Sequence, residues 1–231
     1  MKTLSLIIGA VLTLAPLTHA QTTIAQWTFE TSVPGGAAGI TGQSISGITP
    51  EVGTGSASGF HASASTTWSN PSGNGSVESF SGNNWGVGDY FEFQTSTVGF
   101  SGISVSFDQT SSGTGPRDFT LAYSTDGSNF TDFGSYSVLA NAAPNPVWTT
   151  ATYQSVYTLS FDLSPVSALN NSASVYFRIV DASTTSAGGG TVGTAGTDRL
   201  DNFTVGVVPE PSSVALLCLG AAGLLARRFR R

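Results

Sequence analysis

The 231-residue chain contains a single cysteine, Cys218, which lies in an apolar run near the C-terminus. The region between the two ends therefore forms no disulfide and offers no thiolate to a metal ion. Positive charge is scarce there as well. Arg117, Arg178 and Arg199 stand against thirteen acidic residues between positions 21 and 207, which gives this region a net charge of −10. Nucleic-acid binding requires clustered lysine and arginine, so we expect no nucleic acid among the partners.

Groups for nucleophilic catalysis are also few. His61 is the only histidine after position 20, and it lies in a Gly-, Ser- and Ala-rich stretch typical of a loop. A Ser-His-Asp site needs a histidine base, and the sequence has no G-x-S-x-G elbow, HExxH helix, P-loop or dinucleotide fingerprint. We therefore predict no catalytic residues. Paired carboxylates can still hydrolyse a glycoside, and nothing selects a pair among the acids in or beside predicted strands. These acids are Asp89, Glu92, Asp108, Asp118, Asp162 and Asp181.

Residues 1–20 have the parts of a secretory signal peptide. Lys2 supplies a positive start, positions 4–14 form an apolar core, and Ala20 ends a cleavage site with small residues. The core is too short to span a bilayer comfortably, which favours a signal helix over a retained anchor or a buried helix. We expect signal peptidase to act on this segment and the mature chain to start near Gln21.

Residues 208–231 read VPEPSSVALLCLGAAGLLARRFRR. Because proline does not fit a helix interior, an apolar helix is expected to start after Pro211 and to end at Ala226. This helix reaches only about 22 Å, but local thinning of the bilayer allows it to serve as a single transmembrane helix. Positive charge beside a membrane segment stays on the cytoplasmic side. The positive cluster that would stop translocation and stay in the cytoplasm is formed by Arg227, Arg228, Arg230 and Arg231.

This tail resembles the PEP-CTERM sorting signal of bacterial surface proteins. The resemblance implies that Pro209, Glu210 and Pro211 are the motif recognised by exosortase, a transpeptidase-like membrane enzyme that removes the helix. It also implies export, transient anchoring in the inner membrane, and a final place in the cell envelope, at the cell surface or in the extracellular matrix. An ordinary single-pass anchor behind a proline-containing linker is the alternative.

Residues 21–207 predict an all-β domain. Apolar residues alternate with serine and threonine in short runs such as GISVSFD at 102–108 and SVYFRIVD at 174–181. At 118–133, an Asp126-Gly127 turn joins two hairpin strands. About eight to ten strands with one apolar face each call for an antiparallel β-sandwich. The Gly- and Ser-rich segments are predicted to be loops, the last of them flexible: 35–59, 70–88 and 183–197.

Three motifs give this domain a weaker resemblance to jelly-roll domains of surface proteins, which include carbohydrate-binding modules and galactose-binding-like domains. They are WTFE at 27–30, YSTDG at 123–127 and DRLDNFTV at 198–205. An immunoglobulin-like sandwich fits the alternation equally well.

A structural calcium is the one cofactor that this resemblance implies. In jelly-roll binding modules such an ion often joins the first and last strands, which would make Glu30 and Asp198 or Asp201 its ligands here. Carboxylate oxygens are suitable ligands for calcium. The alternative is a turn in which Asp198 forms a surface pair with Arg199.

Four aromatic residues in or near predicted loops are candidates for stacking on a sugar: Trp68, Trp85, Tyr90 and Trp148. Burial in the core is the commoner fate of tryptophan and stays open as the alternative. The sequence as a whole predicts an exported, non-catalytic β-sandwich with a structural or glycan-associated role and polysaccharide as a partner. A glycan hydrolase that uses two acids is the competing hypothesis.

Overall fold

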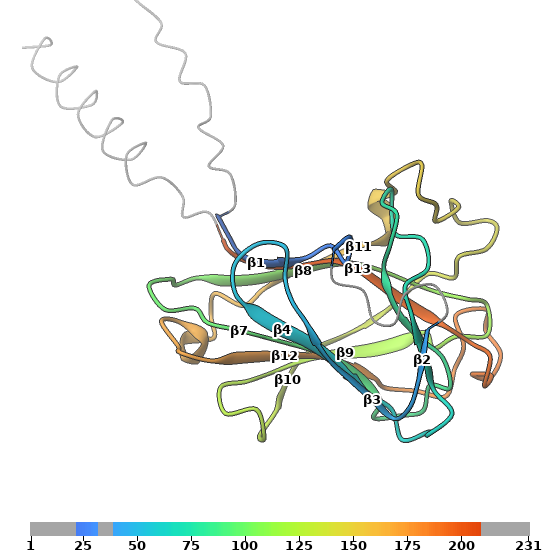
Figure 1. Ribbon diagram of the computed structural model, residues 1–231, viewed down its shortest axis with the longest axis horizontal. Helices are drawn as coiled ribbons and strands as arrows, with labels where there is room; N and C mark the ends of the chain where they lie inside the picture. The colour runs from blue at the N-terminus through green and yellow to red at the C-terminus, as the bar shows by residue number, and fades with distance from the viewer. Residues whose placement is uncertain (1–21, 32–38, 209–231) are drawn as a thin grey trace, which may run out of the picture. The chain divides into compact units, whose positions relative to one another are not determined.

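The computed structural model describes residues 22–31 and 39–208, which form an all-β body of two antiparallel sheets (Figure 1). Thr22–Val208 is one compact unit. The predicted signal helix with Ala20, and the predicted transmembrane helix with the motif at 209–211 and the arginine cluster, lie outside the described residues. Within the described ranges, no helix has the length and apolar character needed to cross a membrane.

The first sheet has seven strands, and β13 (Asp198–Val207) lies at its centre. β13 pairs with β8 (Ile103–Ser111) along most of its length, and β8 pairs with β11 (Thr158–Asp162). On its other side, β13 pairs first with β6 (Phe80–Gly82) and then with β1 (Thr22–Trp27). Beyond β6 the sheet continues through β5 (Thr67–Ser69) to β2 (Ile40–Thr41).

The second sheet has six strands. Their order is β10 (Thr131–Ser137), β9 (Asp118–Ser124), β12 (Val175–Asp181), β7 (Tyr90–Thr95), β4 (Gly55–Phe60) and β3 (Ser44–Ile48). Two short 3-10 turns, η2 (Ser155–Tyr157) and η3 (Ser167–Leu169), flank β11. From β7 to β13 the chain passes back and forth between the sheets, except in the β9–β10 hairpin. Such crossing connections are typical of double-sheet sandwiches.

The core lies between the sheets and is rich in aromatic rings. Phe93 of β7 and Phe203 of β13 stack across the interface with their ring centroids 3.6 Å apart. Trp27 and Phe107 pack against the same Phe203 ring from β1 and β8. The alternation seen in the sequence is confirmed for the central strands, because every second residue there is apolar and buried. Among them are Ile103, Val105, Phe119, Leu121, Val175, Phe177 and Ile179.

Two of the three predicted loops instead contain strands. Segment 35–59 includes β2, β3 and most of β4, and segment 70–88 includes β6. Small residues are required there by close packing: a Cβ atom on Gly59 of β4 would come within 2.6 Å of the Trp68 ring. The third segment, 183–197, is a loop as predicted. This loop is hydrogen-bonded throughout, for example from Ser186 N to Gly190 O and from Gly193 N to Thr114 O, each at 2.9 Å.

Candidate functional site

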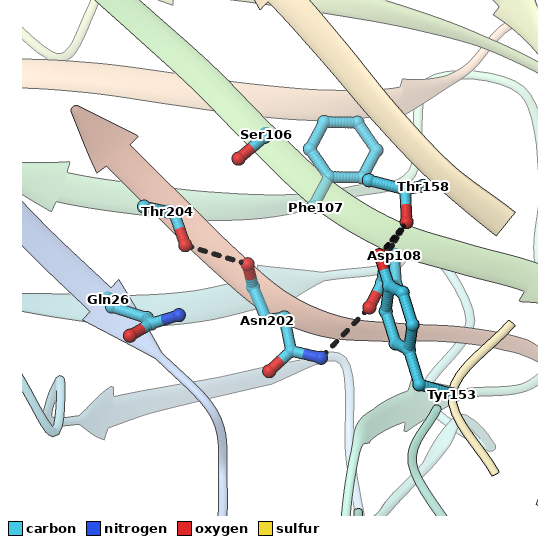
Figure 2. A pocket seen from close by; sticks show the side chains of 8 residues that line it. All are labelled: Gln26, Ser106, Phe107, Asp108, Tyr153, Thr158, Asn202 and Thr204. Atoms are coloured by element: carbon cyan, nitrogen blue, oxygen red, sulfur yellow. Dashed lines mark hydrogen bonds between the residues drawn. The ribbon is translucent and has the colours of Figure 1, made fainter. Parts of the chain in front are cut away.

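A polar hollow of about 360 Å³ opens on the outer face of the first sheet. Because side chains alternate along a strand, the buried Phe203 and Val205 of β13 leave Asn202 and Thr204 facing outward. The same alternation in β8 directs Asp108 outward. Four strands and one loop contribute to the hollow (Figure 2), which is lined by Gln26, Ser106, Phe107, Asp108, Tyr153, Thr158, Asn202 and Thr204.

A β-bulge in β13 shapes the floor of this hollow. The pairing of β13 with β8 shifts between Asp201 and Thr204, and Asn202 has a φ of 53°, in the left-handed region that asparagine tolerates better than most residues. Asn202 Nδ2 then donates a hydrogen bond to Asp108 Oδ2 over 2.9 Å (Figure 2). The bulge therefore brings an amide and a carboxylate together on the sheet surface.

Asp108 is fixed from its other side by the Thr158 hydroxyl, which is in turn hydrogen-bonded to Tyr153. Thr158 Oγ1 donates to Asp108 Oδ1 over 2.5 Å. Since that bond uses the single hydroxyl proton of Thr158, the Tyr153 hydroxyl is the donor to Thr158 Oγ1, also over 2.5 Å. Tyr153 itself is 54% exposed. The hollow thus combines an open aromatic ring with polar groups held in place.

A second carboxylate lies beside this hollow but does not line it. Asp201 is the cross-strand partner of Asp108 and is fully buried beneath a turn at 72–76. Its Oδ2 accepts hydrogen bonds from Asn74 N–H at 2.8 Å and from Ser76 Oγ at 2.7 Å. Burial raises the pKa of Asp201 to about 6, against the lowering effect of these hydrogen bonds. The one carboxylate that lines the hollow, Asp108, is itself only 2% exposed, whereas glycoside hydrolysis uses an accessible pair.

The predicted calcium ligands do not form one group. Asp198 and Asp201 are three residues apart in β13, so their side chains lie on opposite faces of the sheet. Both carboxyl oxygens of Asp198 are hydrogen-bonded to β8 side chains in the interior, and Glu30 Oε1 accepts the Glu78 N–H over 2.8 Å. In residues 22–31 and 39–208, no three His, Cys, Asp or Glu side chains gather as metal ligands. Calcium binding through fewer carboxylates stays a prediction.

The alternative interpretation of this segment, a surface pair between Asp198 and Arg199, is wrong. Asp198 is fully buried, and its two hydrogen-bond partners are Gln109 Nε2 at 2.9 Å and Ser111 Oγ at 2.8 Å. Burial raises the pKa of Asp198 well above its ordinary value. An aspartate at the start of β13 therefore belongs to the interior.

Three of the four predicted stacking residues lack the exposure that stacking on a sugar requires. Trp68, Trp85 and Trp148 are 0%, 6% and 2% exposed, so the prediction for them is wrong. Each ring is buried with its polar atom satisfied, as is usual for tryptophan in a core. The indole N–H groups donate to the carbonyl oxygens of Gly42, Gly82 and Ser72, respectively.

Tyr90, the fourth, lies on the other sheet, away from the hollow. The Arg178 guanidinium covers its ring at 3.9 Å from the centroid and forms an ion pair with Glu92 at 2.7 Å. Tyr153, which does provide an exposed ring, was not a candidate from the sequence. The sequence feature that could have indicated it is that Tyr153 is the lone aromatic residue in the polar stretch TTATYQS, which lies between runs that predict strands.

Comparisons with known proteins bear on the body and on the tail separately. No curated protein matches the chain. The body is similar to the CBM22-1–GH10 modules of Clostridium thermocellum xylanase 10B, solved with xylohexaose, at a TM-score of 0.44 and 13% identity. That similarity covers 83% of this chain but only 29% of the xylanase chain.

Two shorter proteins are similar over nearly their whole length. The CBM22-2 xylan-binding domain of Paenibacillus barcinonensis Xyn10C has a TM-score of 0.43 and 11% identity, over 80% of this chain and 99% of that one. The K1 cleaved adhesin domain of Lys-gingipain from Porphyromonas gingivalis W83 has a TM-score of 0.42 and 12% identity, over 80% and 98%.

The tail gives the family-level result. Residues 207–231 match the model of the PEP-CTERM protein-sorting motif, which confirms the resemblance seen in VPEP, the apolar run and the arginine cluster. Such a motif indicates a protein that is exported and sorted to the cell surface. The chain is therefore one that carries a PEP-CTERM protein-sorting motif behind an all-β body.

Proposed function

We propose that this protein is a non-catalytic module of the cell envelope or extracellular matrix that binds polysaccharide in the hollow on its first sheet. The observation that carries the proposal is the exposed ring of Tyr153 beside the fixed polar groups of Asp108 and Asn202. Sugar rings have apolar faces that stack on aromatic rings and hydroxyl groups that both donate and accept hydrogen bonds. The hollow offers both kinds of partner.

Gln26 adds a polar group that is ready to bind. Its side chain makes no hydrogen bond to any described residue, although it lines the hollow beside Asn202. An amide supplies two donors and a carbonyl acceptor, so it matches a sugar hydroxyl in either role. The size of the hollow, about 360 Å³, falls within the range of small-ligand sites. These features support glycan binding more directly than they support hydrolysis.

The sorting motif supplies the route by which such a module reaches its place of action. In this proposal, signal peptidase cuts after Ala20, and the apolar helix holds the chain in the inner membrane with Arg227 and Arg231 in the cytoplasm. Exosortase then recognises Pro209-Glu210-Pro211 and removes the helix. The support for these steps is the match at residues 207–231 together with the signal-peptide pattern at residues 1–20.

The test is a glycan array on the purified full-length chain, followed by calorimetric titration with the best-binding polysaccharide. Tyr153→Ala removes the exposed ring, and Asn202→Gly removes the amide while keeping a residue that tolerates a φ of 53°. Each variant is expected to bind about tenfold more weakly, which corresponds to about 1.4 kcal/mol. Phe60→Ala, which removes an exposed ring from β4 of the other sheet, is the matched control and should bind normally.

Unchanged affinity in both hollow variants would refute the assignment of the site. Release of shortened products from the bound polysaccharide would instead favour the competing hypothesis of a glycan hydrolase, and Asp108→Asn should then abolish turnover. If no polysaccharide on the array binds, the glycan-associated role is wrong and a purely structural role remains.

A further inference from the structure

A second hollow of about 250 Å³ lies on the same outer face of the first sheet. Arg199 of β13 faces outward there, since its neighbour Leu200 is buried in the core. The turn at 72–76 separates the two hollows along β13, because it covers Asp201, which lies between Arg199 and Asn202. The second hollow is lined by Thr110, Ser111, Ser112, Gly113, Asn141, Thr197 and Arg199.

Arg199 is the one arginine of the described residues that has no ion-pair partner there. Arg117 pairs with Asp118 at 2.9 Å and Arg178 pairs with Glu92 at 2.7 Å. The only hydrogen bond of the Arg199 side chain to a described residue is a long one, from Nη1 to the Ser72 hydroxyl at 3.4 Å. In a body with thirteen acids and three arginines, an unpaired arginine is unexpected on composition alone.

No carboxylate among the described residues forms an ion pair with Arg199, and Asp201, two residues further along β13 on the same face, is hydrogen-bonded to the turn at 72–76 instead. The cross-strand neighbours of Arg199 are Thr110 on β8 and Ser81 on β6, which are both uncharged. Asp198 precedes it in the chain but points into the interior, where burial raises its pKa well above the ordinary value and favours the neutral form. Burial lowers the pKa of Arg199, against the raising effect of a charge on Asp198, but an arginine stays protonated at neutral pH. A half-buried cation without an ion-pair partner is costly, and a bound anion would offset that cost.

Two other polar groups of the second hollow, on Asn141 and Ser112, are placed to donate hydrogen bonds. Asn141 Oδ1 accepts the Trp148 N–H over 3.0 Å, so the Nδ2 group of Asn141 has no acceptor among the described residues. Ser112 Oγ accepts the Thr197 N–H over 2.9 Å, which leaves its hydroxyl proton to donate outward. Together with the Arg199 guanidinium, the hollow presents three kinds of donor and no acid. Charge-assisted donors of this kind hold carboxylate and sulfate oxygens.

We propose that the second hollow is a binding site for a single anionic group of the carboxylate or sulfate type. The source is either the substituent of an acidic sugar or a free inorganic anion. A densely charged polyanion is not expected to bind. The body has a net charge of −10 and would repel those charges of the polyanion that do not lie against Arg199. The proposal rests on Arg199 and its surroundings, and it stands whether or not the first hollow binds polysaccharide.

The experiment is an NMR titration of the full-length chain that follows the Arg199 Nε–H signal at constant ionic strength. Sodium sulfate probes the free anion, sodium glucuronate probes the sugar carboxylate, and glucose is the uncharged counterpart. We expect saturable shifts with sulfate, glucuronate or both, and none with glucose. Arg199→Gln, followed through the Ser112 and Asn141 signals, should weaken binding at least about tenfold, as expected for loss of a charged hydrogen-bonding partner. Arg117→Gln makes the same change of charge outside the hollow and should leave affinity within about twofold.

A second variant keeps the proposal testable if Arg199→Gln does not fold. Asn141→Asp retains the oxygen that accepts the Trp148 N–H but places a carboxylate in the hollow, where it should compete with the added anion and abolish its binding. Binding of glucuronate alone identifies a sugar carboxylate as the ligand, and binding of sulfate alone identifies a sulfate group. The proposal is overturned if neither anion binds, or if both variants bind as the unmodified chain does.

Discussion

Asp181→Asn should stabilise the protein at neutral pH and leave its stability unchanged in acid. Asp181 ends β12 inside the sandwich and is 1% exposed. Its Oδ1 accepts the Ser183 N–H over 3.2 Å, but its Oδ2 has no hydrogen-bond partner. Burial raises the pKa of Asp181 to about 6, and the negative charges of Asp89 and Asp118 also raise it. Ionisation of the Asp181 side chain therefore destabilises the folded state.

The sign and size of the effect follow from the two pKa values. The folded state binds the proton more tightly than the unfolded state, in which the pKa of the group is 3.8. The stability that this proton contributes is complete below pH 3.8 and is lost as the pH rises to about 6. That difference corresponds to at most about 3 kcal/mol, and screening by nearby solvent reduces it toward about 1 kcal/mol. Asparagine keeps the Oδ1 acceptor and carries no charge, so it avoids this loss.

Urea unfolding of both proteins across the range from about pH 3 to about pH 7.5 measures the effect. The free energy of unfolding of Asp181→Asn should exceed that of the unmodified chain by about 1 to 3 kcal/mol above pH 6, and the difference should vanish below pH 4. His61, whose pKa burial lowers to about 4, titrates in the same range with the opposite sign, but it contributes to both proteins. Asp132→Asn makes the same substitution at an exposed position of β10 and serves as the control. A difference that is independent of pH, or a variant that is less stable at pH 7.5, would refute the reasoning.

Two further predictions concern the backbone and the tail. Gly53→Ala should destabilise the protein clearly more than Gly47→Ala. Both have a left-handed φ, of 79° and 82°, but only at Gly53 would the new Cβ atom collide with the Ile24 carbonyl oxygen; backbone strain alone costs about 1 to 2 kcal/mol. Equal free energies of unfolding for the two variants would contradict this. For the tail, mass spectrometry of the protein from its native cells should show a chain that starts near Gln21 and lacks the arginine cluster, whereas an intact chain of 231 residues would count against processing.

Alternation made the central strands predictable. In the runs around Val105, Leu121 and Phe177, every second residue is apolar. The side chains of these three residues are fully buried. The same signal failed for β4, whose sequence is GSASGF, because the space beneath the Trp68 ring admits only small residues such as Gly59. A strand made of small residues cannot be told from a loop by counting apolar residues.

The candidate site was less predictable for a different reason. Asp108 and Asn202 are 94 residues apart in the chain, and they meet only because of the register of β8 against β13 and the bulge after Asp201. Neither the strand register nor the bulge can be predicted from a single sequence. Burial of the three tryptophans was equally invisible, because a ring in a polar stretch looks the same whether it packs inward or outward. Tyr153, the ring that does face solvent, lies in a stretch with no stronger aromatic signal than theirs.

The central position of β13 has a mechanical consequence. This strand carries Arg199 and Asn202 on its outer face and ends at Val207, where the sorting motif begins. A pull between a molecule held at either residue and the C-terminal end would run along the strand itself. Its ladders with β8 and β1 would then be loaded in shear, so that many hydrogen bonds resist together instead of opening one after another. The strand that displays the polar groups is thus also the one through which tension reaches the C-terminal end of the body.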